Sequence, residues 1–524
     1  MHEIEPDRYI YDPLYGIIHL PQYIWNVLSC PELQRLREVR LCNINSLCLT
    51  GGANINRFEH SIGTCHLALE CLANWPPLNP LDERTQRQFI LAALLHDIVN
   101  GPFGHSIEYI ESKKGFDPEE AFKYVVLGTP DQSYEYWRAQ LEPIFFSLQK
   151  DLVRRLPMED IEAIGKIIGG KGRLGQLING NMDLDNIDNV FRLAYHIGIV
   201  RSGEVPLNLA RSLFVERGKV VVKEKGVTQI QEWFNIRKKL YSFLLLNPEE
   251  FSAKCMLSEA VELAKLKPGF ALTWHDTDYD LLVRLLNASP IRLEERGYLF
   301  AIDTTLENEL SCGILSDKLK SVLEQKGLRL SSDAQLELVN GGWKIIDKAK
   351  DRTKCYVIEK KEQKLKVYMK VLRSVDVREI IMNLVKGDLY GCVGIFSTAK
   401  TEKDTVFDDP NLRRELENGV SETVGRAFQG RFRSVSIAFH LIKDMNKTER
   451  QVAIEMDNGE IATIGTSSKR YLIGAFFRNP QLNIHHVNDE PRIVGKIRKE
   501  IMTYLSTCLE DPAIEEVGLY GEAK

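Results

Sequence analysis

The chain has 524 residues, 44% of them hydrophobic, and a formal net charge of −5. It is longer than one compact domain usually is, so we expect two or three structural units. The acidic balance argues against nucleic acid as the main partner, because a phosphate backbone is bound by an excess of positive charge. The 10 cysteines form no C-x-x-C pair, which indicates reduced, buried thiols rather than a structural zinc site or a disulfide framework.

Further absences in the sequence narrow the class of protein. Residues 1–8 are charged and lack the apolar core of a signal peptide. No apolar run approaches the roughly 18 residues that are needed to cross a membrane. The sequence also contains neither a phosphate-binding loop nor a glycine-rich dinucleotide fingerprint. The pattern therefore predicts a cytoplasmic protein that has no membrane partner.

The first part of the chain, to residue 291, carries mostly helical patterns. Residues 9–20 predict a turn and a short strand, and a short β-like patch occurs at 219–222. Apolar residues at helical spacing predict helices at about 21–28, 31–39, 56–72, 86–96, 118–128, 134–156, 158–168, 181–193, 233–241 and 250–265. We therefore expect a helical major lobe.

The composition changes after residue 291. Two β runs, 355–358 and 365–371, are joined by a polar turn and predict a hairpin. Farther on, the patterns predict strands at 435–441, 452–456, 461–464 and 471–477, a hairpin turn at 457–459 and a helix at 491–509. The expected fold class is mainly α with a smaller α+β part, and the expected domains are 1–291, an α/β insertion at 292–375, and 376–524.

Four side chains of the first lobe could hold one divalent metal. They are His60, His96, Asp97 and Asp185, and the central pair is adjacent at the end of an apolar helix. Imidazoles together with carboxylates suit Mn, Fe, Co, Zn or Mg. A single histidine is more often an ordinary core or surface residue, so it is the set of four that carries the signal. A metal with open positions lowers the pKa of a bound water or polarises a phosphoryl oxygen, which indicates hydrolytic chemistry.

Two other groups of residues could act on a phosphate substrate. His105 and Glu108 are three residues apart and share a helical face, so the carboxylate could orient the imidazole as a general acid or base. The alternative is an ordinary helical His–Glu pair. Arg57 and Arg237 could hold phosphate oxygens through their planar guanidinium groups. The alternative for each arginine alone is a surface ion pair.

These motifs resemble the HD-domain dNTP triphosphohydrolases, a family that includes bacterial dGTPases and nucleotide-activated animal dNTPases. The resemblance covers about 1–290 and about 375–395, and it does not explain 292–375. It is carried by the segments 12–16, 31–37, 57–63, 96–105, 183–192, 237–241, 377–380 and 389–394.

The resemblance implies an HD-domain fold for the helical lobe and a role for each group of residues. His60, His96, Asp97 and Asp185 would bind the divalent metal ion, and His105 with Glu108 would form the catalytic pair. The implied reaction is attack of water on the α-phosphorus of a deoxynucleoside triphosphate, which releases a deoxynucleoside and tripolyphosphate.

The same resemblance implies nucleotide contacts and partners. Arg57 and Arg237 would hold the triphosphate of the nucleotide substrate. Gln34, Arg37 and Arg378 match positions that bind an activating nucleotide in the animal enzymes. A homo-oligomer is implied as well.

The chain departs from the family pattern at several positions. Asn100 and Glu108 follow the bacterial form of the signature, and Ser29 replaces the aspartate that reads guanine in the animal enzymes. The helix of the fourth ligand has Asn186, Asn189 and Leu193 where the family often has lysine, tyrosine and aspartate. Two alternatives therefore stay open. The chain could hydrolyse another nucleotide, such as a monophosphate, a ribonucleotide or a cyclic signal, or it could be a nucleotide sensor without catalysis.

Overall fold

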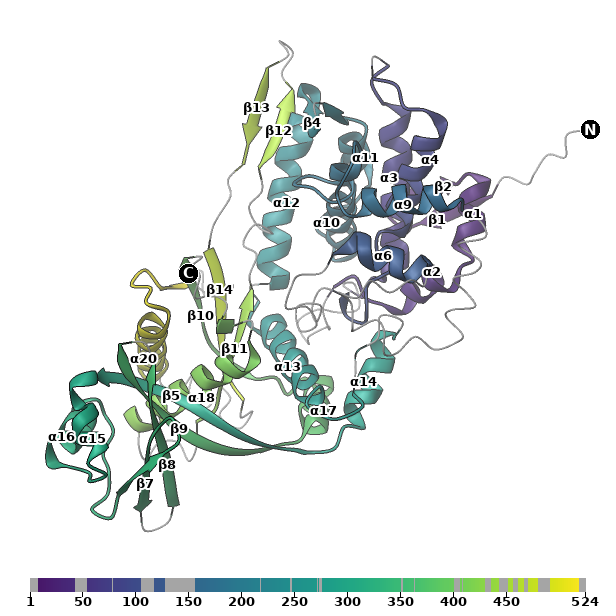
Figure 1. The fold of residues 1–524 in the computed structure, drawn as a ribbon. Helices are drawn as coiled ribbons and strands as arrows, with labels where there is room; N and C mark the ends of the chain where they lie inside the picture. The colour runs from purple at the N-terminus through teal and green to yellow at the C-terminus, as the bar shows by residue number, and fades with distance from the viewer. Residues whose placement is uncertain are drawn as a thin grey trace, which may run out of the picture. The chain divides into compact units, whose positions relative to one another are not determined.

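The computed structural model describes residues 8–42, 54–77, 79–104, 117–127, 156–216, 218–245, 247–270, 272, 276–349, 352–361, 363–399, 406–407, 409–428, 435–442, 451–455, 460–465, 470–478 and 491–517. The chain divides into two compact units (Figure 1). Unit 1 contains Met1–Asn287 and Asp444–Lys469, and unit 2 contains Ala288–Lys443 and Arg470–Glu522.

Unit 1 begins with an antiparallel hairpin of β1 (Tyr9–Asp12) and β2 (Gly16–His19). The carboxylate of Asp12 closes its turn, because Oδ1 accepts hydrogen bonds from the backbone N–H groups of Leu14 at 2.8 Å and Tyr15 at 2.9 Å. Two short helices, α1 (Gln22–Leu28) and α2 (Pro31–Arg35), and a 3₁₀ turn (Leu36–Glu38) come next. These elements lead the chain to the helical core.

Helices make up most of unit 1 (Figure 1). Side-chain caps start α3, α4 and α10, among others, since Asn56, Asp82 and Asp183 each accept a hydrogen bond from the backbone N–H three residues on. Helix α3 packs against both α4 and α10, and α9 packs against α4 and α6. The bounds are α3 (Arg57–Ala73), α4 (Glu83–Leu95), α6 (Pro118–Leu127), α9 (Met158–Ile168), α10 (Leu184–His196), α11 (Glu204–Ala210), α12 (Val227–Leu245), α13 (Pro248–Ala264) and α14 (Asp278–Leu286).

A four-stranded sheet completes unit 1. Its order is β13-β12-β4-β3, from β3 (Leu213–Glu216), β4 (Lys219–Lys223), β12 (Val452–Glu455) and β13 (Ile461–Ile464). Strand β12 pairs with β4 in parallel, and the two neighbouring pairs are antiparallel. Val452 and Ile454 are buried in the same core as the helices. A segment from late in the sequence therefore belongs to unit 1.

The described residues of unit 2 form two antiparallel sheets. The first has the order β5-β9-β8-β7-β6, and α15 (Glu307–Ser311) and α16 (Asp317–Gln325) contribute leucines to the core that it shares with them. Its strands are β5 (Ile291–Asp303), β6 (Gln335–Val339), β7 (Gly342–Ala349), β8 (Arg352–Lys361) and β9 (Lys364–Val375).

The second sheet of unit 2 has the order β11-β14-β10-β15, from β10 (Gly391–Ala399), β11 (Ile437–Ile442), β14 (Arg470–Phe477) and β15 (Glu515–Val517). Helices α18 (Pro410–Ala427) and α20 (Pro491–Leu509) share its core, and α17 (Val377–Lys386) is a further helix of unit 2. Helix α18 also packs on β5. Gly419 permits this close approach, because a Cβ atom there would lie 1.8 Å from the carbonyl oxygen of Tyr298.

The expected fold class, mainly α with a smaller α+β part, is confirmed. The predicted hairpin is also present, since β8 and β9 pair with Ile358 opposite Val367. Most of the predicted helix 134–156 and the predicted turn 457–459 lie outside the described residues. The division at 291 and 375 stays a prediction about domains. In the structure, residues 292–375 belong to the same compact unit as the later segments of unit 2, because β5 and α18 pack together.

Candidate metal centre

The predicted metal ligands come from three helical segments of unit 1. His60 lies in the first turn of α3, His96 and Asp97 come directly after the last turn of α4, and Asp185 lies in the first turn of α10. Ligand atoms of His60, His96 and Asp97 all lie within 4.8 Å of one another. Oδ1 of Asp185 is 2.9 Å from Nε2 of His60 and 3.7 Å from Nε2 of His96. The structure therefore brings all four side chains together.

Both imidazoles are held by their Nδ1 atoms. Nδ1 of His96 lies 2.9 Å from the carbonyl oxygen of Ala93, which can only accept, so this Nδ1 carries the proton. Nδ1 of His60 lies 2.7 Å from Oδ2 of the buried Asp188 and donates to it. The two Nε2 atoms face each other, 3.2 Å apart, and a cation that displaces the proton from Nε2 of His60 would meet the lone pairs of both rings. Histidines whose other ring nitrogen is held in this way are typical of metal sites.

The electrostatics of the centre favour a positive charge among these atoms. Burial would lower the pKa of His60, but hydrogen bonds to the Asp185 and Asp188 carboxylates outweigh it and raise that pKa to about 10. Burial would raise the pKa of Asp188, but Arg192 and His60 lower it to about 2. The donor set offers ionised oxygens and imidazole lone pairs, so it fits a divalent cation.

Arg57 lies beside Asp97, one of the candidate metal ligands. It is buried, and its Nη1 donates to Oδ2 of Asp97 at 2.8 Å while its Nε donates to the carbonyl oxygen of Arg40 at 3.2 Å. Burial would raise the pKa of Asp97, but Arg57 and then His96 hold that pKa below its usual value. Gly104 leaves room for the guanidinium, because a Cβ atom there would lie 2.0 Å from Nη2. Arg57 orients Asp97, and its contact with a substrate phosphate stays a prediction.

Arg237 contacts the residue next to Asp185, the fourth candidate ligand. It is fully buried in α12, and its guanidinium carbon lies 5.2 Å from the centre of the Trp233 ring and 4.5 Å from that of Tyr241. Its Nη1 donates to the side-chain oxygen of Asn186, the neighbour of Asp185. Arg237 is thus tied to the start of α10, and its role toward the triphosphate also stays a prediction.

The predicted catalytic pair, His105 and Glu108, lies outside the described residues. The stretch that leads to it is anchored by Asp278 of α14, whose Oδ1 accepts a hydrogen bond from the backbone N–H of Phe103 at 2.7 Å. Phe103 has a φ of 54°, which is uncommon for a residue other than glycine. Sequence reasoning missed this anchor, since Asp278 lies far along the chain.

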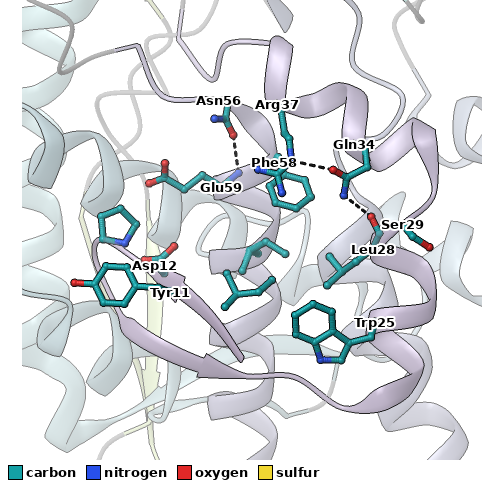
Figure 2. Close-up of a pocket in the computed structure, with 13 residues that line it drawn as sticks. Tyr11, Asp12, Trp25, Leu28, Ser29, Gln34, Arg37, Asn56, Phe58 and Glu59 are labelled. Carbon is teal, nitrogen blue, oxygen red and sulfur yellow. Dashed lines mark hydrogen bonds between the residues drawn. The ribbon is translucent and has the colours of Figure 1, made fainter. Parts of the chain in front are cut away.

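Two of the predicted activator residues line a pocket in unit 1 (Figure 2). Gln34 and Arg37 border a cavity of about 530 Å³, which is large enough for a small molecule. Nε of Arg37 donates to Oε1 of Gln34 at 2.9 Å, and the guanidinium lies 3.8 Å from the centre of the Phe58 ring. Arg378, the third, is exposed at the start of α17 in unit 2.

Sequence reasoning did not assign a role to Asp188 or Arg192, although both act in the centre. Arg192 is fully buried, and its Nε and Nη2 hold the two oxygens of Asp188 at 2.9 and 3.0 Å. The spacing offers a signal in retrospect, because Asp188 lies one helical turn after Asp185 and Arg192 one turn further. Such spacing is common on solvated helix faces, so it could not be interpreted alone.

Comparison with known proteins gives a family for this region. Residues 57–160 match the HD domain family. Uncharacterized protein YwfO of Bacillus subtilis is 25% identical over 265 residues, which are 50% of this chain and 57% of YwfO. Uncharacterized protein MJ1154 of Methanocaldococcus jannaschii is 26% identical over 259 residues, 48% of this chain and 49% of the relative.

A zebrafish relative has a named activity. Deoxynucleoside triphosphate triphosphohydrolase SAMHD1 of Danio rerio is 28% identical over 272 residues, 45% of this chain and 42% of SAMHD1. The chain thus spans about half the length of the curated relatives that it matches. Within the described part of the chain, every helix is too short or too polar to cross a bilayer.

Proposed function

We propose that this chain, whose residues 57–160 match the HD domain family, is a metal-dependent dNTP triphosphohydrolase. Water attacks the α-phosphorus, the bond between that phosphorus and the 5′-oxygen breaks, and the products are a deoxynucleoside and tripolyphosphate. A phosphohydrolase of the HD type agrees with the activity for which the zebrafish relative is named.

One observation carries the proposal. His60, His96, Asp97 and Asp185 converge, and the Nε2 atoms of the two imidazoles lie 3.2 Å apart with carboxylates beside them. These four residues would hold the divalent metal, which could be Mn, Fe, Co, Zn or Mg. When bound, such a metal supplies a water of lowered pKa and polarises a phosphoryl oxygen.

The protein's own side chains would do the remaining work. Arg57 holds Asp97 in place and presents positive charge beside the centre, where charge develops on the phosphate oxygens. Arg237 would contribute a second positive charge from α12. We assign His105, oriented by Glu108, to the transfer of a proton to the leaving 5′-oxygen, on the strength of the family motif alone.

We extend the proposal to regulation by nucleotide. The pocket that Gln34 and Arg37 border would take an activating nucleotide, with Arg37 toward the phosphates. Arg378 is assigned to activator binding on the resemblance alone, and the enzyme would act as a homo-oligomer. Because Ser29 lines the same pocket where the animal enzymes use aspartate, the activator need not carry guanine.

Product analysis tests the proposal. The metal-loaded protein is incubated with each dNTP and NTP, alone and in pairs, and the products are separated by chromatography. Tripolyphosphate together with free deoxynucleoside is the expected outcome. A monophosphate or inorganic phosphate would move the chain to the runner-up activity on another nucleotide. Tight nucleotide binding without turnover under any metal would favour a sensor.

A further inference from the structure

The wall of the pocket and the metal centre meet at one side chain. Asp12 and Glu59 line the pocket, and Figure 2 shows them on the side opposite Gln34 and Arg37. Neither Asp12 nor Glu59 is one of the four metal ligands. Both nevertheless reach Nη1 of Arg192, from Oδ2 of Asp12 at 2.9 Å and from Oε1 of Glu59 at 2.6 Å.

The other side of the same guanidinium binds Asp188, which contacts the candidate ligand His60. Nε and Nη2 of Arg192 donate to both oxygens of Asp188, and Oδ2 of Asp188 lies 2.7 Å from Nδ1 of His60. Tyr15 donates a further hydrogen bond to Asp188 at 2.8 Å. An unbroken chain of charged contacts therefore joins the pocket wall to the imidazole ring.

The packing makes this chain of contacts stiff. Arg192 and Asp188 are fully buried, and His60 is 1% exposed. Gly63, one turn after Glu59 on α3, has no side chain, and a Cβ atom there would lie 2.1 Å from both the guanidinium and the Asp188 carboxylate. Because the packing leaves no room for independent movement, a shift of Arg192 must displace Asp188.

The carboxylates around Arg192 compete for its positive charge. A single guanidinium is shared by three carboxylates, those of Asp12, Glu59 and Asp188. If one acceptor is lost, Arg192 binds the others more closely. A closer hold on Asp188 draws its oxygen away from Nδ1 of His60, and an imidazole with a weaker acceptor at Nδ1 is a poorer metal ligand through Nε2.

We propose that Arg192 links the pocket wall to the metal centre. Glu59, on the pocket wall, acts through this arginine as a positioning residue that sets how strongly His60 binds a divalent cation. The inference rests on the metal centre of the proposed function and adds a route by which the pocket wall adjusts it.

Metal titration of the full chain tests this route without substrate. Resident metal is removed with a chelator, and Co²⁺ is titrated while its visible absorption is recorded, since that absorption reports the ligand geometry. Glu59→Gln should lower the Co²⁺ affinity about threefold or more and shift the absorption band, because changes along a coupled network typically have such an effect. Asp12→Asn, which removes the other wall carboxylate, should act in the same direction.

Glu70→Gln is the matched control. Glu70 lies on the same helix, its side chain is 24% exposed against 21% for Glu59, and it pairs with Arg211 at 2.7 Å, away from the metal ligands. Its Co²⁺ titration should equal that of the unmodified protein. Equal titrations of Glu59→Gln and the unmodified protein, with melting curves that show both folded, would overturn the proposal.

A double-mutant cycle tests the path itself. Asp188→Asn should lower the Co²⁺ affinity by about 10- to 100-fold, as for other outer partners of ligand histidines. Adding Glu59→Gln to Asp188→Asn should cause no further change, because the path is already cut. Additive losses would instead mean that Glu59 acts only through its charge. Since no substrate is present, failure of dNTP turnover would contradict the proposed function and leave this outcome standing.

Discussion

The ionised groups of the candidate metal centre in unit 1 and those on the first sheet of unit 2 are arranged differently. Around the centre, Arg192 is fully buried and its carboxylate partners are interlocked. On the sheet, Lys370 pairs with Glu294 at 2.7 Å, but their side chains are 44% and 63% exposed. Water screens the exposed pair, whereas the buried group must be satisfied by the protein. The difference teaches that burial, not distance, decides which ion pairs shape a site.

The largest expected effect comes from breaking the centre itself. Asp185→Ala removes an oxygen that lies 2.9 Å from Nε2 of His60, so we expect metal content and turnover both to fall below detection. His105→Ala, by contrast, should keep the metal and lose turnover. Metal analysis of the purified variants together with the product assay checks both. Full activity of His105→Ala would refute its assigned role.

Removing the shared arginine should cost stability. In Arg192→Met three carboxylates lose a common partner inside the protein, and breaking a buried ion pair typically costs about 3–5 kcal/mol. Urea denaturation measures the loss. Arg211→Met is the matched comparison, because Arg211 is 41% exposed and its pair with Glu70 should contribute less than about 1 kcal/mol. Equal losses in the two variants would contradict the contrast between buried and exposed pairs.

Glu422 of unit 2 forms partly buried ion pairs, and their contribution to stability depends on pH. Burial would raise the pKa of Glu422, but Lys354 and Arg426 outweigh it and hold that pKa below its usual value. A lowered pKa in the folded state means that ionised Glu422 stabilises the fold above the unfolded value of about 4.3, and that this stability is lost as the pH falls through the folded value. The melting temperature of Glu422→Gln should therefore lie below that of the unmodified protein at about pH 6. The gap in melting temperature should shrink as the pH is lowered below about 4.3, and a gap that widens there would contradict the prediction.

The smallest effect is expected on the exposed sheet pair. Lys370→Gln removes the partner of Glu294, yet the pair is solvated, so the melting temperature should stay unchanged within error. A clear drop would show that exposed pairs of this sheet also matter, and it would weaken the comparison with the centre.

The four candidate metal ligands could be selected from the sequence because their side-chain chemistry is recognisable locally. His96 and Asp97 end a buried apolar helix, and imidazoles with carboxylates are recognisable as ligand types wherever they occur. The support for these ligands could not be predicted. Arg192 joins Asp12 across 180 residues and Glu59 across 133 residues, and only the fold brings such distant positions together.

The secondary structure shows the same contrast between local patterns, which could be predicted, and contacts between distant segments, which could not. Helices with a clear apolar face were predicted within a few residues, as for α9 and α20. Strand β5 was missed because charged residues interrupt its apolar pattern, and its extended form depends on pairing with β9 along its length. The parallel pairing of β12 with β4 was also out of reach, since it joins segments more than 200 residues apart in the sequence.

Isotope labelling of the products tests the central claim most directly. The metal-loaded protein hydrolyses a dNTP in water enriched in ¹⁸O, and both products are analysed by mass spectrometry. Attack on the α-phosphorus predicts one ¹⁸O atom in tripolyphosphate and an unlabelled deoxynucleoside. Label in the deoxynucleoside, or cleavage to a monophosphate and pyrophosphate, would contradict the account.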